Sequence, residues 1–102
     1  MGQSRKLSEL GLSARSGNAQ AAITGIALDS RAVKPGFLFA AIPGTRVHGA
    51  EFITFALRMQ AGAILTDRAG AAQAAQVLAG YPDVALVVAE DVRAAFAMTV
   101  AL

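Results

Sequence analysis

The sequence predicts an α/β domain built on a small, mixed, partly parallel sheet that is flanked by helices. Three short apolar runs, at residues 37–42, 63–66 and 84–89, are bounded by turn residues, as buried strands are. Segments with helical periodicity alternate with these runs, and such an alternation favours parallel strands. The length of 102 residues fits one domain.

The first third of the chain is predicted to contain a helix, a loop and a strand. Residues 4–15 carry leucines at a weak helical spacing, and residues 16–22 are small or polar, which indicates a loop. Residues 23–30 alternate apolar side chains with others and predict a strand, with Gly25 as a bulge. The segment 32–36 ends in Pro-Gly, which predicts a type II turn.

The middle of the chain is predicted to run from strand to loop to helix. The apolar run 37–42 predicts a buried strand, and residues 43–50 form a loop punctuated by proline and glycine. Residues 51–60 place apolar side chains at helical spacing and predict an amphipathic helix, with Gly62 as its C-cap.

The last third is predicted to contain two strands and two helices. Asp67 follows the strand at 63–66 and is predicted to cap a helix over roughly 69–79. Asp91 follows the strand at 84–89 and is predicted to cap the last helix.

The last helix, over residues 91–102, is predicted to bury Val92, Phe96 and Val100 on one stripe. It is still running at Leu102, with no glycine, proline or polar cap. Complete domains usually close a helix before the chain ends, so we expect one domain of a longer, truncated protein. A natural, frayed C-terminal helix is the alternative.

Composition excludes several classes of protein. Cysteine is absent, which excludes disulfides, thiolate nucleophiles and cysteine-ligated metals. His48 is the single histidine, which leaves a Ser–His pair or a His-rich metal site little support. No stretch of 18 residues lacks a polar interruption, and no apolar run follows the basic N-terminus. We therefore expect a soluble, cytoplasmic protein without membrane contact.

Charge is unevenly distributed along the chain. Between residues 11 and 50 the single acidic residue is Asp29. The basic residues of the same segment are Arg15, Arg31, Lys34 and Arg46. This half could hold an anion, although charge alone favours the alternative of a solvated basic surface.

The densest polar signal lies in residues 28–50, after two of the predicted strands. The Asp-Ser-Arg segment 29–31 follows the first strand, and the loop 43–49, with two glycines, a hydroxyl and an arginine, follows the second. Ligands of open α/β sheets bind beyond the carboxyl ends of strands, and glycine lets backbone amides approach a ligand closely. The pattern favours a phosphate site. A plain turn bonded by Asp29 and a solvated charge at Arg46 are the alternatives.

Motifs of other chemistries are missing. The sequence has no G-x-x-x-x-G-K-[ST], G-x-G-x-x-G or G-x-S-x-G, and its carboxylates are few and scattered. We therefore predict no catalytic residue and no metal site in this chain. Basic residues are not interleaved with aromatic ones, so no nucleic-acid partner is expected. Phe52, Phe55 and Met59 are predicted to belong to the core rather than to a stacking platform.

Several short motifs follow one another over about forty residues. They are Asp29-Ser30-Arg31, Pro35-Gly36, Leu38-Phe39-Ala40, Gly44 with Gly49, Phe52-Ile53 and Gly62-Ala63. This series resembles the opening of the Mur ligases, which build the peptide stem of the bacterial cell wall by ATP-driven amide formation. The serine in Asp-Ser-Arg is similar to the tripeptide synthetases, the branch that adds the third amino acid. The D-Ala-D-Ala-adding branch, a stand-alone regulatory nucleotide-binding module, a nucleic-acid-binding domain and a structural interaction domain remain alternatives.

The resemblance implies the fold of the family's N-terminal domain, which binds the UDP moiety of UDP-N-acetylmuramoyl-dipeptide. The residues implied to bind UDP are Leu28, Ser30, Thr45, Arg46 and Val47. The residues implied to support them are Asp29, Arg31, Gly44, His48 and Gly49. The ATP, Mg²⁺ and catalytic sites implied for the parent ligase lie beyond Leu102, so no cofactor is expected here. The expected partners are the UDP-linked dipeptide and the remaining domains of the ligase.

Overall fold

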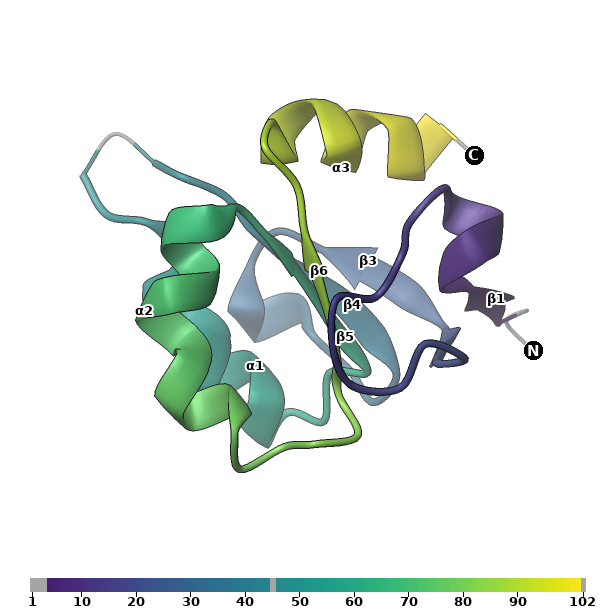
Figure 1. Ribbon diagram of the computed structural model, residues 1–102, viewed down its shortest axis with the longest axis horizontal. Coiled ribbons are helices and arrows are strands. Elements are labelled where there is room, and N and C mark those ends of the chain that lie inside the picture. The colour runs from purple at the N-terminus through teal and green to yellow at the C-terminus, as the bar shows by residue number, and fades with distance from the viewer. Residues whose placement is uncertain (1–3, 45, 102) are drawn as a thin grey trace.

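The computed structural model describes residues 4–44 and 46–101, and it confirms the predicted α/β class (Figure 1). A four-stranded sheet in the order β3-β4-β5-β6 is parallel throughout. Its strands are β3 (Gly25–Ala27), β4 (Phe37–Ala41), β5 (Ala63–Thr66) and β6 (Ala85–Val88). A separate antiparallel pair joins β1 (Arg5–Lys6) to β2 (Ala22–Ile23), so the parallel and antiparallel pairings belong to two sheets.

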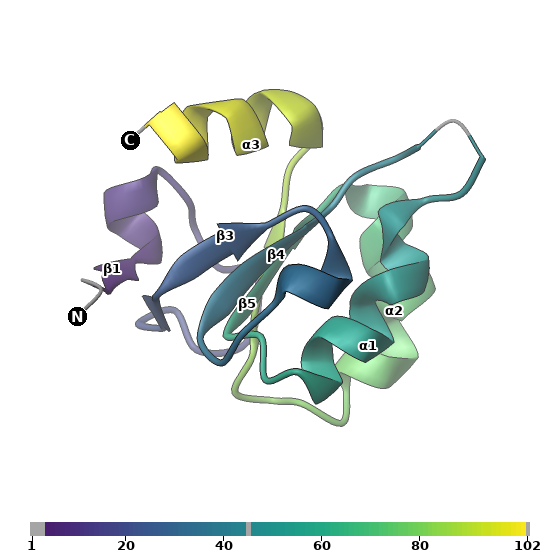
Figure 2. The ribbon, with the colours of Figure 1, turned by 180° about the vertical axis from the view of Figure 1, so that it is seen from behind.

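Helices cover both faces of the parallel sheet (Figures 1 and 2). Helices α1 (Ile53–Arg58) and α2 (Arg68–Leu78) lie on one face, and α3 (Val92–Ala101) lies on the other with the N-terminal segment. Three short 3-10 helices complete the fold: η1 (Leu7–Leu10), η2 (Ser30–Ala32) and η3 (Gly49–Phe52). The longest helix in the described part has 11 residues, and none there is long and apolar enough to cross a membrane.

Alternate side chains of the inner strands fill two cores. Along β4, Leu38 and Ala40 join the core on the α3 side, whereas Phe39 and Ala41 join the core on the α1 and α2 side. Because both faces of the strand are covered, its sequence is continuously apolar rather than alternating. Phe39 is 1% exposed, and full burial of such a side chain stabilises the fold by about 1.5–3 kcal/mol.

The type II turn predicted before β4 is confirmed. The Phe37 amide donates to the Lys34 carbonyl at 3.0 Å, and Gly36 has the positive φ of 86° that the third turn position requires. The predicted cap of α3 is also present, because the Ala94 amide donates to Asp91 Oδ1 at 3.0 Å.

Two predictions for the N-terminal third are wrong. The helix expected over residues 4–15 is only the single turn η1, because Gly11, at φ 76°, ends it in the left-handed conformation. The strand expected over 23–30 is two short strands, of which β2 pairs with β1 and β3 pairs with β4. Between them, the Thr24 amide donates to the Gly36 carbonyl at 3.0 Å, and the chain passes from one sheet to the other.

The helix predicted over residues 51–60 is shorter and differently ended. It starts as η3 and ends at Arg58. Gln60, with φ 69°, takes the left-handed conformation that was expected at Gly62. The Gly62 amide instead donates to the Phe37 carbonyl at 2.8 Å, at the start of β5.

The apolar stripe predicted along α3 is wrong at its far end. Val92 is buried, but Val100 is 54% exposed and Thr99 is 1% exposed. Thr99 lies seven residues, about two helical turns, after Val92 and so returns to the same face. Its hydroxyl donates to the Ala95 carbonyl at 2.8 Å, which satisfies the buried polar group.

Candidate ligand-binding site

The carboxyl ends of β3 and β4 lie next to each other, because the two strands are parallel with Ala27 opposite Phe39. Residues 28–31 follow β3, and residues 42–48 follow β4. The two polar segments singled out in the sequence therefore leave the sheet at the same edge, where ligands of open α/β sheets bind.

A cavity of about 660 Å³ lies beside the first segment, and its volume is within the range of small-molecule sites. Its lining residues are Leu28, Asp29, Ser30, Arg31, Phe52 and Phe55. Four of the predicted site residues thus line one cavity together. Ser30 is buried, whereas Leu28 is 53% exposed and presents an apolar surface to the ligand side.

The assignment of Phe52, Phe55 and Met59 to the core is wrong. Their exposed fractions are 46%, 44% and 39%, and the first two form a wall of the cavity. The inward face of the helix is instead built from Ile53, with Ala56 and Leu57. A helix with two apolar stripes can bury only one of them, and this signal was available in the sequence.

Asp29 forms the local turn that was considered as an alternative for it. Its Oδ1 accepts from the Arg31 amide at 2.9 Å, and its Oδ2 accepts from the Arg31 guanidinium at 2.7 Å. Hydrogen bonds from the Arg31 side chain and amide lower the pKa of Asp29 to about 2. Because Asp29 holds the guanidinium, Arg31 presents less net charge to a ligand than an unpaired arginine would.

Residues 43–48, here called the hairpin, form a narrow loop after β4. The Gly44 amide donates to the Val47 carbonyl at 2.9 Å, and Pro43 and His48 pair as an antiparallel bridge at its base. A Cβ on Gly44 would lie 2.7 Å from that carbonyl oxygen, so the narrow loop requires glycine. Arg46 and Val47 are exposed, and the hairpin projects from the body of the domain (Figure 1).

Thr45, which was predicted to bind UDP, lies outside the described residues. Of the other predicted hairpin residues, Gly49 donates its amide to the Ile42 carbonyl at 2.9 Å and closes the hairpin base. The predicted residues therefore fall into two groups: 28–31 line the cavity, while 44 and 46–49 form the hairpin and its base.

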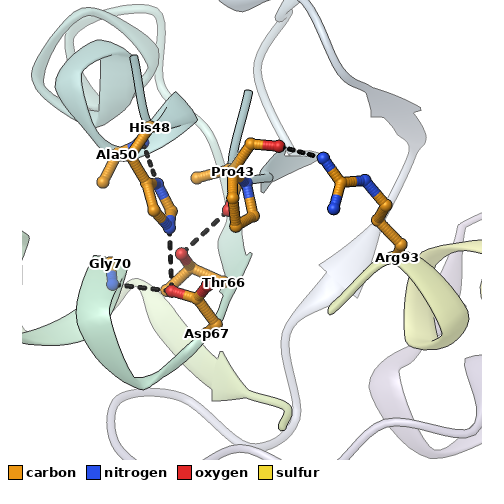
Figure 3. A network of polar contacts seen from close by, with 8 residues as sticks. Pro43, His48, Ala50, Thr66, Asp67, Gly70 and Arg93 are labelled. Carbon is orange, nitrogen blue, oxygen red and sulfur yellow. Dashed lines mark hydrogen bonds and ion pairs between the residues drawn. The ribbon is translucent and has the colours of Figure 1, made fainter. Parts of the chain in front are cut away.

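A polar network fixes the base of the hairpin to the rest of the fold (Figure 3). His48 Nε2 lies 2.8 Å from Asp67 Oδ1, which also accepts from the Gly70 amide at 2.7 Å and so caps α2 as predicted. Burial raises the pKa of Asp67, but hydrogen bonds from the Gly70 amide and the His48 ring outweigh it, and the pKa is lowered. On the other side, the Arg93 guanidinium donates to the Pro43 carbonyl. Sequence reasoning did not foresee the roles of His48 and Arg93, because both depend on long-range contacts.

Neither ATP nor Mg²⁺ fits the residues of this chain. The sequence lacks a phosphate-binding G-x-x-x-x-G-K-[ST] loop. Within residues 4–44 and 46–101, no three carboxylate or histidine side chains come together to hold a metal ion. The chemistry that the described residues offer is recognition: an apolar wall, a buried hydroxyl and a glycine hairpin that carries an arginine.

Comparison with known proteins agrees with this architecture. A family model described as "Mur ligase family, catalytic domain" matches residues 22–101. The chain therefore belongs to the Mur ligase family.

Three curated relatives share one name, UDP-N-acetylmuramoyl-L-alanyl-D-glutamate--2,6-diaminopimelate ligase. The protein from Streptomyces coelicolor is 56% identical over 84% of this chain and 16% of its own length. Those from Caulobacter vibrioides and Caldanaerobacter subterraneus are 42% and 38% identical, over 78% and 79% of this chain and 15% of their own lengths. The chain thus spans about a sixth of the length of these relatives.

Solved structures agree with the fold. A crystal structure of MurF from Acinetobacter baumannii has a TM-score of 0.68 at 19% identity, and covers 95% of this chain and 20% of its own. Another structure, of a UDP-N-acetylmuramoylalanyl-D-glutamyl-2,6-diaminopimelate--D-alanyl-D-alanyl ligase from the same organism, has a TM-score of 0.67 at 19% identity. It covers 94% of this chain and 20% of that chain. These likenesses establish the fold.

Proposed function

We propose that this chain is the domain that binds the UDP moiety of UDP-N-acetylmuramoyl-dipeptide within a longer, ATP-dependent ligase. The observation that carries the proposal is the cavity at the carboxyl end of β3, lined by Leu28–Arg31 and two exposed phenylalanines. It lies at the sheet edge from which the glycine hairpin also leaves. A nucleoside diphosphate needs an apolar surface for its base and hydrogen-bond donors for its phosphates.

The two groups of residues suit the two halves of UDP. Phe52 and Phe55 offer aromatic surface on which a uracil ring can stack, and Ser30 offers a hydroxyl beside it. The hairpin offers the Arg46 side chain to a phosphate. We assign Leu28, Ser30, Arg46 and Val47 to direct contact. Thr45 belongs to the same proposed set on the resemblance alone.

The ligase step that we propose for the whole protein is the addition of 2,6-diaminopimelate, the third amino acid of the stem peptide. A relative 56% identical to this chain carries that name, whereas the solved D-alanyl-D-alanyl ligase is 19% identical. ATP and Mg²⁺ would be held by the part of the protein outside these 102 residues, because the residues present here do not fit them. A phosphate-binding loop encoded soon after Leu102 would support this division of labour.

Titration of the chain with UDP, UDP-N-acetylmuramic acid and ATP, followed by amide chemical shifts, tests the proposal. We expect shifts at Ser30, Arg46 and Val47 with both uridine ligands, and weaker binding of ATP. Phe52→Ser should abolish most of the response, whereas Ser13→Ala, an exposed control in a loop, should leave it unchanged. Equal responses to ATP and UDP, or no response at millimolar ligand (~4 kcal/mol of binding), would remove the basis of the assignment.

A further inference from the structure

The ring of His48 uses both of its nitrogens. The Ala50 amide donates to Nδ1 at 2.9 Å, and Nε2 lies 2.8 Å from Asp67 Oδ1 (Figure 3). An amide only donates, so Nδ1 must carry a lone pair and the ring proton sits on Nε2. Nε2 then donates to the Asp67 carboxylate. The His48 and Asp67 side chains are 16% and 19% exposed, so water competes little for this bond.

The partners of the ring belong to different parts of the candidate site. Ala50 lies in η3, the helix that carries Phe52 to the cavity wall. Asp67 caps α2, which packs on the sheet. The backbone of His48 pairs with Pro43 at the base of the hairpin. One side chain therefore connects the hairpin, the aromatic wall and a helix of the core.

Close packing leaves the ring little freedom. A Cβ on Gly70 would lie 2.8 Å from His48 Cε1, so the first turn of α2 approaches the ring directly. The opposite arm of the hairpin base is held by the hydrogen bond from Arg93 to the Pro43 carbonyl. The hairpin is thus fixed on two sides, by α2 through His48 and by α3 through Arg93.

We propose that His48 is a positioning residue of the ligand site, which sets the hairpin and the Phe52 wall relative to each other through its bond to Asp67. The proposal rests on the proposed function for its ligand, a uridine diphosphate. It does not require His48 to touch that ligand. It requires the proton on Nε2 and a hairpin geometry that depends on the bond between the two side chains.

Two substitutions remove this bond while keeping the local caps. In His48→Asn, the shorter side chain can still accept from the Ala50 amide but cannot reach Asp67. In Asp67→Ser, the hydroxyl can still cap α2 at Gly70 but cannot reach His48. Asp83→Ser, in an exposed turn, is the control for removing an acidic residue.

The first arm of the experiment uses no ligand. Long-range ¹H–¹⁵N spectra of the chain should show the proton of His48 on Nε2 at neutral pH. Both single variants should shift the amides of Arg46, Val47 and Phe52, and the control should not. A proton on Nδ1, or unshifted hairpin amides in a folded His48→Asn variant, would overturn the positioning role.

The second arm measures UDP affinity of the wild type, both single variants and the double variant. We expect each single variant to weaken binding roughly tenfold, and the double variant to be no weaker than either, because both lose one shared bond. Additive losses would refute the pair as the acting unit. If the wild type binds no UDP, the proposed function fails and the ligand-free arm alone decides whether His48 fixes the hairpin.

Discussion

Gly70→Ala should strongly destabilise the fold, although alanine favours helices over glycine. A Cβ at this position would lie 2.0 Å from Thr66 Oγ1 and 2.8 Å from His48 Cε1, far inside van der Waals contact. Thr66 is fully buried, and its hydroxyl donates to the Ala41 carbonyl at 2.9 Å, so it cannot rotate away without losing that bond.

The expected loss follows from three terms. Overpacking costs about 1–3 kcal/mol, and a broken buried hydrogen bond costs about 1–3 kcal/mol. The helix preference of alanine returns at most about 1 kcal/mol. The net loss in the free energy of unfolding is about 2–4 kcal/mol, which lowers the Tm of a domain this size by roughly 10–30 °C.

Urea and thermal unfolding followed by circular dichroism measure this loss. Gly80→Ala is the matched control, because its nearest contact would be the Val77 carbonyl oxygen at an ordinary 3.5 Å. We expect the control to stay within about 0.5 kcal/mol of the wild type. If Gly70→Ala were as stable as Gly80→Ala, the packing of α2 against Thr66 and His48 described above would be incorrect.

Three further predictions follow from the same region. Thr66→Val keeps the shape but leaves the Ala41 carbonyl without its hydroxyl partner, which should lower the free energy of unfolding by about 1–2 kcal/mol. Because the pKa of Asp67 is lowered in the folded state, its contribution is present above its ordinary value of 3.8 and is lost as pH falls through the folded pKa. Urea unfolding between pH 7 and pH 2 should show this loss, and Asp67→Asn, which keeps an acceptor for the Gly70 amide, should lack that part of it. Phe52→Ser, at a 46% exposed position, should change the urea midpoint little, and an early unfolding transition would show that its ring is part of the core after all.

The sequence predicted well those elements whose pattern depends on burial by both neighbours. The runs 37–42, 63–66 and 84–89 all became strands of one parallel sheet, because strands covered on both faces must be apolar throughout. The segment 23–30 was less predictable, since nothing local says that the chain changes sheets at Thr24. That change depends on pairing with β1 and β4, which are distant in sequence.

The candidate site was predictable to the extent that it follows from strand ends. Residues 28–31 were found because they follow a strand in a parallel sheet, and they line the cavity. Phe52 was misassigned, because hydrophobicity alone does not say which of two apolar stripes faces inward. Arg93 was not found, because its contact with Pro43 joins positions 50 residues apart.

The alanine-rich composition contributes to the site as well as to helix formation. The buried face of α2 consists of Gly70, Ala71 and Ala74, so no large side chain separates the helix from the sheet. Helices packed through small residues can approach closely, and here the first turn of α2 meets Thr66 and the ring of His48. A bulkier face would move Asp67 outward and break its 2.8 Å contact with His48. The small residues of a helix that has no place in the cavity therefore help to determine where the hairpin lies.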